Sequence, residues 1–586
     1  MLLTCQEQAW GDVQVALLQT GLPVTTWATV LVPQVSTEEL STLINNFPAL
    51  RSLSFQDHLI PILRQPKILD LLARNSEAGK LPSVRVWAGE PDVIDWIWKA
   101  AIESKKPATA RQRLLWQLAD KQAQQLSVDV ALDELSDVAD IALDDLEADR
   151  ICQCKEGRVS FTHDLWGDWS RQRLLLAHEK ELPAFIETQL DNPVWHRAIV
   201  LLGLDLLERR VKPERWRELL EQSKSLENGE SQFCDLLLEA LIRAAQTTDA
   251  LAQAWSQLCD QDGLWLRRLL TRFLHLATSP NPEMLEYARS REGLSETWAS
   301  SVNRKPKPAL WGAMLRFLDA HRETCTDLAP LQTAEVAECW VRWTATDTPL
   351  RKQAADLALA VAWQTLRYRQ HWHLRHYSSN RYSHSDSEAT AKKAYSAVLL
   401  AIDVCADLVI DVALCACGRR EPTEPFPPIS EPDEPEFQPR PIPPEFEAAL
   451  NFVPPWRKYE IEIPAWQDGP RWPIDCVFRE ICWKSFEFLR FIVLKPDIAA
   501  EITLALVIKK GGTRLPESDY QSTHYDFELA DAHLYRQPFY DNGPFQCLLT
   551  FHPTIGLDTV VKLVNFTTER WRERQQWKLA NESQRE

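Results

Sequence analysis

The sequence predicts a mainly α-helical protein, in which helices joined by short loops stack in pairs into an α-solenoid-like array. Apolar residues recur three and four positions apart along most of the 586 residues, and short Pro, Asn or Gly segments separate these stretches. Glycine is rare, with 17 residues, and 24 Trp against 3 Met indicate an interior filled by large rigid rings. No fixed-period motif occurs, so any repeat is degenerate.

The composition excludes several classes of protein. The 65 Lys and Arg residues against 83 Asp and Glu residues give a net charge of −18 without a long basic run, so bulk nucleic-acid binding is not expected. The first residues, MLLTCQEQAWGD, lack the basic and apolar stretches of a signal peptide. We therefore expect a cytoplasmic protein whose 13 cysteines are reduced.

The most apolar segment, Ala394–Cys417, is expected to be one soluble helix. Asp403, Asp407 and Asp411 interrupt it at intervals of four residues, which is unfavourable in a membrane-spanning helix. We therefore expect no association with a membrane.

The first 75 residues begin with two strand-like segments, Met1–Cys5 and Thr29–Val35, and continue into helices. A helix is expected over Ser36–Phe47, because its first residue is a serine that can cap it and a glutamate stands at the third helical position. Ser54–Asn75 carries Leu and Ile at helical spacing around Pro66, which predicts two short helices that meet at this proline.

Residues 127–149 hold nine acidic residues and no Lys or Arg, with apolar residues at helical spacing, which predicts one amphipathic helix with a solvated acidic face. Arg150–Cys154 and Arg158–Thr162 each alternate, and the Lys-Glu-Gly between them makes a turn, so a hairpin is expected. A further helix opens near His163. Helices, a small hairpin and another helix describe a winged helix within residues 76–180.

Residues 181–420 are expected to form the α-solenoid-like region. Its clearest helical patterns are Trp195–Glu208, Pro213–Glu221, Gln232–Ala245, Leu264–Leu276, Leu310–Ala320 and Leu350–Tyr368. Twelve of the 35 residues in 421–455 are proline, with acidic residues among them, so this segment is a linker or, alternatively, a strip for an aromatic groove. Residues 456–586 make a C-terminal helical module, with helical patterns over Glu480–Val493 and Ile498–Ile508.

Three segments, LLTCQEQAW (Leu2–Trp10), LIPILRQPKILDLLARN and RVSFTHDLWGDW, together resemble the STAND class of signal-transduction ATPases, which includes NACHT and NB-ARC proteins. The first is similar to the strand that ends the phosphate-loop core, although Gln6 stands where that family commonly has an arginine. The second resembles the helical lid, whose proline packs against adenine; Pro66 matches it. The third resembles the winged helix, whose histidine contacts the β-phosphate of ADP; His163 matches it.

The resemblance implies that residues 1–75 are a remnant of the nucleotide-binding core and lid. It also implies that Pro66 and His163 bind ADP or ATP only when a completed ATPase core is present. The alternative for His163 is that it merely caps the helix that follows it.

The sequence lacks the motif that would hold the phosphates. G-x-x-x-x-G-K-[ST] is absent, since no two glycines are five positions apart and the one Gly-Lys pair, Gly79-Lys80, is followed by leucine. No nucleophile signature is present either. We therefore expect a chain that is not an enzyme by itself and that begins inside the ATPase core, either as one half of a split protein completed by an upstream ATPase fragment or as a truncated gene product.

A metal site is a weaker candidate. Four histidines gather with arginines in one span: His371, His373, His376 and His384. Imidazole is a zinc ligand, and the three aspartates of Ala394–Cys417 would add carboxylates. A basic aromatic loop, or a surface for nucleic acid or an acidic partner, are the alternatives. The Cys-x-Cys pairs at 152–154 and 415–417 are expected to be structural, because single-residue spacing is poor for tetrahedral zinc.

The functional expectation is a non-catalytic regulatory and sensor region of a STAND-type ATPase that binds a protein partner through its helical solenoid. The resemblance places such proteins in bacterial signalling or antiphage defence. A nucleotide-independent helical-repeat scaffold is the alternative, and a metal-dependent hydrolase using the His371–Asp411 region is a third. No cofactor is expected for the isolated chain.

Overall fold

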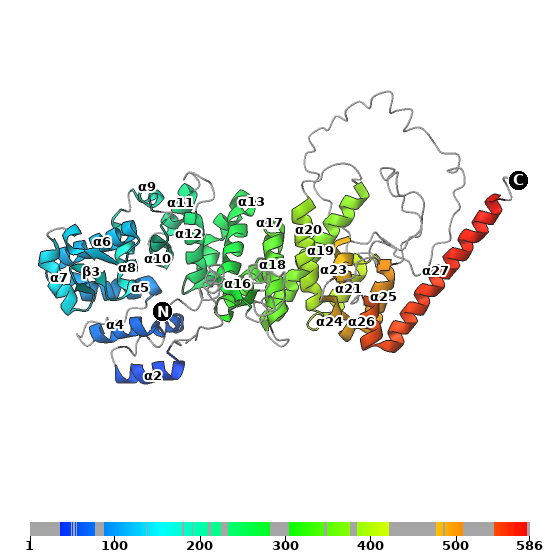
Figure 1. The fold of residues 1–586 in the computed structure, drawn as a ribbon, viewed down its shortest axis with the longest axis horizontal. Coiled ribbons are helices and arrows are strands. Elements are labelled where there is room, and N and C mark those ends of the chain that lie inside the picture. Colours follow the sequence, from blue (N-terminus) through cyan, green and yellow to red (C-terminus); the bar gives the residue numbers. More distant parts are fainter. Residues whose placement is uncertain are drawn as a thin grey trace, which may run out of the picture. The chain divides into compact units, whose positions relative to one another are not determined.

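The computed structural model describes residues 35–47, 50, 53, 56–76, 87–135, 138–178, 181–189, 192–208, 213–223, 232–281, 304–344, 349–375, 384–420, 476–484, 487–507 and 544–582. Within these residues the chain is mainly helical with little sheet, which confirms the predicted mainly α class (Figure 1). The chain divides into two compact units, Met1–His321 and Arg322–Glu586. This boundary falls inside the region predicted as 181–420, and the division into five segments stays a prediction. None of the described helices is long and apolar enough to cross a bilayer.

Helix α2 (Thr37–Asn46) opens the described part of the first unit. Ser36 caps it as predicted, because its hydroxyl accepts the amide N–H of Glu39 at 3.1 Å. In return, the Glu39 carboxylate accepts the amide N–H of Ser36 at 2.8 Å. This reciprocal pair satisfies two of the backbone donors that a helix start leaves without partners.

Two short helices meet at Pro66, also as predicted. After the single turn η4 (Asp57–Leu59), they are α3 (Ile60–Leu63) and α4 (Pro66–Ser76). Proline is tolerated at the first position of α4 because its missing N–H would have no partner there. Ile68 and Leu72 of α4 are fully buried, so this helix is held by one apolar face.

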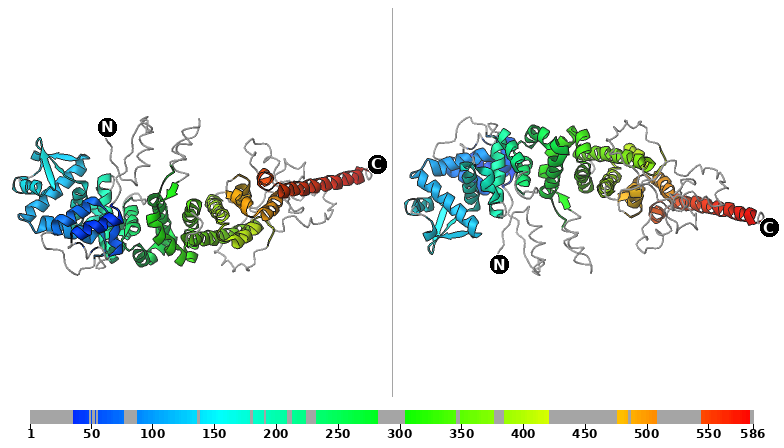
Figure 2. Two further views of the ribbon diagram at one scale, coloured as in Figure 1. Left: turned by 90° about the horizontal axis from the view of Figure 1, so that it is seen from below. Right: turned by 90° about the horizontal axis from the view of Figure 1, so that it is seen from above.

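Further helices and a small antiparallel sheet follow. The helices are α5 (Glu90–Trp98), continued by the π-helical turn η5 (Lys99–Glu103), α6 (Ala108–Gln125), α7 (Val138–Ala148) and α8 (Asp164–Ala177). The strands are β1 (Asp129–Ala131), β2 (Cys152–Lys155) and β3 (Arg158–Phe161), in the order β1-β3-β2. They pack against α6, α7 and α8, and the cyan strands lie beside blue and cyan helices in Figure 2.

The prediction of one amphipathic helix over residues 127–149 is wrong in its first half. Strand β1 and the 3-10 turn η6 (Leu132–Glu134) occupy this part, and only α7 is helical. Val130 of β1 lies opposite Val159 of β3, and both side chains are fully buried. The backbone hydrogen bonds of this pairing replace those of a helix, so tertiary packing overrides the helical spacing.

Strands β2 and β3 form the predicted hairpin. Lys155 pairs with Arg158, so the connection consists of Glu156 and Gly157, whose φ angles are 53° and 73°. Positive φ at both central residues defines the type I′ turn, whose twist matches that of the strands. The hairpin ends immediately before His163, where α8 begins.

The rest of the first unit is a succession of helices. They are α9 (Leu182–Glu187), η7 (Pro193–Trp195), α10 (His196–Glu208), α11 (Pro213–Gln222), α12 (Gln232–Arg243), α13 (Thr247–Ala277) and α16 (Pro308–Ala320), with the strand pair β4 (Thr278–Pro280) and β5 (Arg304–Pro306) before α16. Helix α10 packs on α12, α12 on α13 and α13 on α16. Non-helical φ/ψ angles at Asp260–Gly263 divide α13 into two helices, and the second of them matches the helix predicted over Leu264–Leu276.

The second unit is also built from helices. They are α17 (Arg322–Leu328), α18 (Pro330–Trp343), α19 (Pro349–Arg375), α20 (His384–Leu400), α21 (Ala406–Ala416), α23 (Cys476–Lys484), α24 (Glu487–Leu494), α25 (Pro496–Val507), α26 (Pro544–Phe551) and α27 (Pro553–Glu582). Helix α18 packs on α19 and α20, whereas α26 packs on α24 and α27. The pattern predicted as one helix over Glu480–Val493 is divided between α23 and α24.

The expected single helix over Ala394–Cys417 is wrong, because residues 401–405 turn between α20 and α21. Asp403 lies in this turn and therefore does not share a helical face with Asp407 and Asp411. The stripe of three carboxylates expected from the sequence is not formed.

A buried arginine accounts for this turn. The guanidinium group of Arg351, which is 0% exposed, donates to the carbonyl of Leu400 and to the carboxylate of Asp403, each at 3.1 Å. It also donates to the carbonyls of Val341 and Thr344 at the end of α18. One side chain thus satisfies acceptors at the ends of two helices.

Some predictions lie outside the described residues. These are the strand-like pieces that open the chain, the Gly79-Lys80 pair and the proline-rich segment 421–455.

Candidate functional site

His163 stands at the junction of strand β3 and helix α8. It is the N-cap of α8, and its Nδ1 accepts the amide N–H of Leu165 at 3.2 Å. Thr162 fixes the preceding backbone, since its hydroxyl donates to the carbonyl of Arg150 at 2.6 Å. Because the cap uses the Nδ1 lone pair, the neutral ring carries its proton on Nε2 and can donate from there.

The surroundings of His163 favour the neutral form of its imidazole. Burial lowers its pKa below the usual value and the positive charge of Lys67 lowers it further, against the opposing effect of Asp164 and Asp168. A neutral ring can donate one hydrogen bond to an anion but supplies no charge. Positive charge at this site must therefore come from neighbouring residues.

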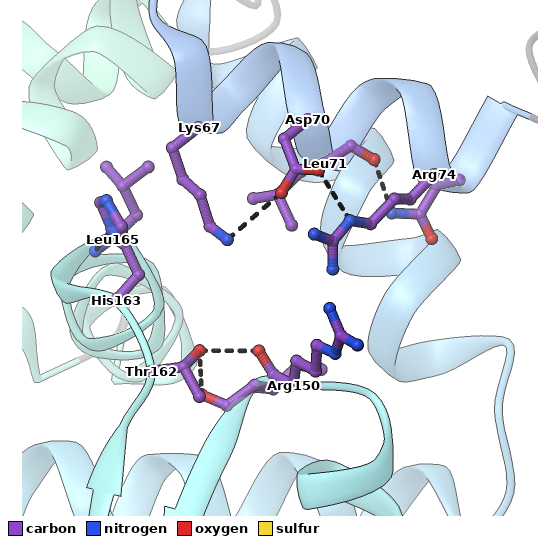
Figure 3. A network of polar contacts seen from close by, with 10 residues as sticks. Lys67, Asp70, Leu71, Arg74, Arg150, Thr162, His163 and Leu165 are labelled. Atoms are coloured by element: carbon purple, nitrogen blue, oxygen red, sulfur yellow. Dashed lines mark hydrogen bonds and ion pairs between the residues drawn. The ribbon is translucent and has the colours of Figure 1, made fainter.

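Helix α4 lies across from His163 and brings such charge. Pro66 is the first residue of α4, and the ammonium group of the next residue, Lys67, lies between Asp70 and His163 in Figure 3. The electrostatic effect of Lys67 on His163 is a second sign that these groups are close. The structure therefore brings the helix of Pro66 to His163, while the nucleotide-binding roles of the two residues stay predictions.

Two arginines complete the cationic surroundings. Asp70 pairs with Lys67 Nζ at 3.4 Å and with Arg74 Nε at 2.7 Å along α4. Arg150 approaches from the turn between α7 and β2, and its guanidinium group points toward that of Arg74 (Figure 3). Among the described residues no carboxylate pairs with Arg150. Positive groups from two separate elements thus face one space beside His163.

Sequence reasoning did not identify the charged residues of this site. The spacing of Asp70 and Arg74 by four residues is a visible signal for an ion pair on a helix. No local pattern shows that Arg150, which follows an acidic helix, faces α4. Only the packing of the first unit brings it there.

The chemistry that this arrangement offers is the binding of an oxyanion. Guanidinium groups match the geometry of phosphate and carboxylate oxygens, and ammonium groups supply a compact positive charge. The carboxylate of Asp70 is occupied by its ion pairs with Lys67 and Arg74. The residues of this site can bind and orient an anion.

The metal candidates gain no support. No group of three or more His, Cys, Asp or Glu side chains that could hold a metal ion occurs among the described residues. The side chains of the four predicted histidines lie outside the described residues: His371, His373, His376 and His384. Of the carboxylates expected beside them, Asp403 pairs with Arg351 and Arg490, and Asp411 pairs with Arg420.

Three thiols of the Cys-x-Cys pairs are not poised to bind metal. Burial raises the pKa of Cys152 and Cys417 to about 12 and that of Cys415 to about 11. Such thiols stay protonated at neutral pH, whereas the thiolate is the form that binds metals. The burial of Cys152, Cys415 and Cys417 agrees with the structural role predicted for them.

No protein-family model matches the chain, and a search of curated proteins returns no match.

Proposed function

We propose that this chain is a non-catalytic regulatory and sensor region of a STAND-type ATPase. The observation that carries the proposal is the proximity of α4 and His163 (Figure 3). Pro66 begins α4 and His163 caps α8, although the two residues are far apart in the sequence. A nucleotide whose base meets the proline and whose phosphate accepts from the imidazole Nε2 would bridge the two helices and couple its own state to their relative position.

The order of elements between α6 and α8 supports a winged helix at this site. Strand β1 pairs with β3 beside the β2–β3 hairpin, which would be the wing. Helix α8 carries Trp166 and Trp169, which are buried with ring centroids 5.2 Å apart. A packed core resists gradual deformation. A ligand that binds His163 would therefore shift the proposed winged helix as one body.

The same unit is unsuited to bind nucleic acid. Helix α7, which precedes the hairpin, exposes Asp144 and Asp145 and contains no Lys or Arg. Helix α8 has Trp166, Trp169 and Ser170 in the interior. Neither helix offers the cationic surface that a phosphate backbone requires.

The later helices support a partner-binding solenoid. In the first unit α10, α12, α13 and α16 pack in succession, and in the second unit α18 packs on α19 and α20. Helices that contact mainly their sequence neighbours form extended surfaces, which solenoids use to bind proteins. We assign recognition of a protein partner to this region, in bacterial signalling or antiphage defence.

One observation favours the alternative of a nucleotide-independent scaffold. The Nδ1 of His163 already has a structural role, because it caps α8 through the Leu165 amide. A histidine can occupy an N-cap without any ligand. The experiment must therefore separate the cap from the Nε2 donor.

His163→Asn makes this separation. Asparagine is a favoured N-cap whose side-chain oxygen accepts the same N–H, but it cannot reproduce the imidazole Nε2. We suggest purifying the tagged full chain and the variant from the cells that encode it, in ADP and separately in ATP, and identifying bound proteins by mass spectrometry. The proposal expects a partner with a G-x-x-x-x-G-K-[ST] segment, whose retention differs between ADP and ATP and loses this difference in His163→Asn.

Other outcomes exclude the proposal. Equal retention of partners in ADP, in ATP and by His163→Asn would establish the scaffold instead. Hydrolysis of ATP by the purified chain alone would contradict the non-catalytic role. An unchanged melting temperature of His163→Asn is the control that the cap is preserved.

A further inference from the structure

Two guanidinium groups face each other between α4 and the hairpin. Arg74 extends from α4 and Arg150 from the turn before β2, and each points toward the other (Figure 3). Like charges that face each other repel, and the repulsion is relieved when an anion lies between them. Asp70 neutralises Arg74 through a 2.7 Å ion pair, but no described carboxylate pairs with Arg150.

The charges around this space are unbalanced. Lys67, Arg74 and Arg150 are positive, and Asp70 is the one carboxylate that pairs with any of them among the described residues. Three positive groups thus share one paired carboxylate. A diphosphate group carries at least two negative charges on adjacent phosphoryl groups and would supply acceptors that Asp70 alone does not.

The backbone holds Arg150 in an unusual conformation. Its φ is 58°, in the left-handed region that few residues other than glycine adopt. The Thr162 hydroxyl fixes this turn by donating to the carbonyls of Arg150 and Ile151 at 2.6 and 3.1 Å. This conformation ends α7, because the amide N–H of Ile151 donates to the Leu146 carbonyl and that of Arg150 to the Glu147 carbonyl, each at 2.9 Å.

We propose that Lys67, Arg74 and Arg150 form a clamp that binds the diphosphate group of a small molecule and thereby ties α4 to the hairpin. Phosphoryl oxygens accept from both guanidinium groups, which match such oxygens in a bidentate geometry, and from the Lys67 ammonium group. Asp70 competes with the ligand, because it already occupies Lys67 and Arg74. The free protein thus holds an internal carboxylate that the ligand displaces.

The clamp does not depend on the proposed function. Neither Pro66 nor His163 belongs to it, and its ligand need not be a nucleotide. Inorganic pyrophosphate and ADP share the chemistry that the clamp recognises.

The test is isothermal titration of the full chain with inorganic pyrophosphate at low ionic strength. We expect saturable binding that Arg74→Gln and Arg150→Gln each weaken by about tenfold or more, which corresponds to 1.4 kcal/mol. Asp70→Asn is expected to tighten binding, because it removes the competing carboxylate. Arg150→Gly should lose binding without losing stability, since glycine relieves the left-handed backbone.

Arg158→Gln is the matched control. Arg158 lies on the hairpin that follows Arg150 and carries the same charge as Arg150. Its side chain is 47% exposed and pairs with Asp129. Its replacement should leave the affinity unchanged. If Arg158→Gln weakened pyrophosphate binding as much as Arg150→Gln does, binding would depend on net charge alone and the clamp would be overturned.

The remaining arms assign every other outcome. ADP that binds more tightly than pyrophosphate supports a clamp for nucleotides, and equal or weaker binding of ADP supports a clamp for diphosphate alone. No saturable binding of either, or wild-type affinity in Arg74→Gln and Arg150→Gln, overturns the clamp. His163→Asn is expected to bind pyrophosphate as the wild type does. If the partner experiment fails but pyrophosphate binds, the proposed function is rejected and the clamp is kept. If the partner experiment succeeds but pyrophosphate does not bind, only the clamp is rejected.

Discussion

Replacing Glu208 by glutamine is expected to make the first unit more stable above neutral pH. Glu208 ends α10, and its Oε1 accepts the amide N–H of Ala245 at 2.9 Å, whereas its Oε2 is buried without a hydrogen-bond partner among the described residues. Burial raises the pKa of Glu208 to about 7, and the negative charges of Glu90, Asp92 and Asp205 also raise it. The hydrogen bond from Ala245 lowers this pKa in part. The folded protein therefore favours the protonated carboxyl.

The sign of the pH dependence follows from the two pKa values. The unfolded chain releases this proton near pH 4.5 and the folded chain near pH 7, so the folded state binds more protons in between. The free energy of unfolding falls as the pH rises through this range and stays low above it. The difference between 4.5 and about 7 corresponds to about 3 kcal/mol. Glutamine cannot ionise and keeps the acceptor for Ala245, so Glu208→Gln gains up to this amount above pH 7.

The assay compares melting temperatures of Glu208→Gln and the wild type near pH 5 and near pH 8. We expect a small difference at the lower pH and a much larger advantage of the variant at the upper pH. Glu239→Gln is the control of opposite sign. Burial acts to raise the pKa of Glu239, but Arg243 and Arg272 outweigh it and lower the pKa, so this variant loses stability near pH 8. A difference between Glu208→Gln and the wild type that is the same at both pH values would refute the reasoning.

Other substitutions test the packing, each by thermal unfolding. Arg351→Met should destabilise the second unit by about 3 kcal/mol, because it leaves buried carbonyls and part of Asp403 without a donor; a neutral effect would contradict this. Gly203→Ala would place a Cβ 2.7 Å from the Cβ of Ala240. The cost of overpacking, about 2 kcal/mol, exceeds the gain of about 1 kcal/mol in helix propensity, so we expect the variant to be less stable. A higher melting temperature would contradict this. Gly157→Ala should lower the free energy of unfolding by about 1 kcal/mol, because alanine is disfavoured at the φ of 73°. Steric overlap is not the cause, since no atom would lie within 4 Å of the added Cβ. An unchanged melting temperature would contradict this explanation.

The sequence predicted correctly those features whose causes lie within a few residues. The Ser36 and Glu39 capping box, the junction at Pro66 and the two-residue hairpin turn each depend on neighbouring residues. The helix predicted over 127–149 failed because β1 takes its hydrogen bonds from β3, which lies far along the chain. Apolar spacing describes which side chains are buried but not which backbone partner they meet.

The candidate site shows the same division. The sequence pointed to Pro66 and His163 through the segments that contain them, and local caps placed each at the start of a helix. It gave no sign of Arg74 and Arg150, because an ion pair within α4 and a basic residue before a hairpin have ordinary local explanations.

The sequence by itself determined the mainly helical class, the hairpin before α8 and the lack of a phosphate-binding glycine motif. Only the tertiary structure decided that β1 is a strand, that Arg351 ends α20 and that Lys67, Arg74 and Arg150 face one space. The physical reason is the range of the interactions. Turns and caps are fixed by hydrogen bonds between near neighbours, whereas burial and charge act between residues that meet only after the helices have packed.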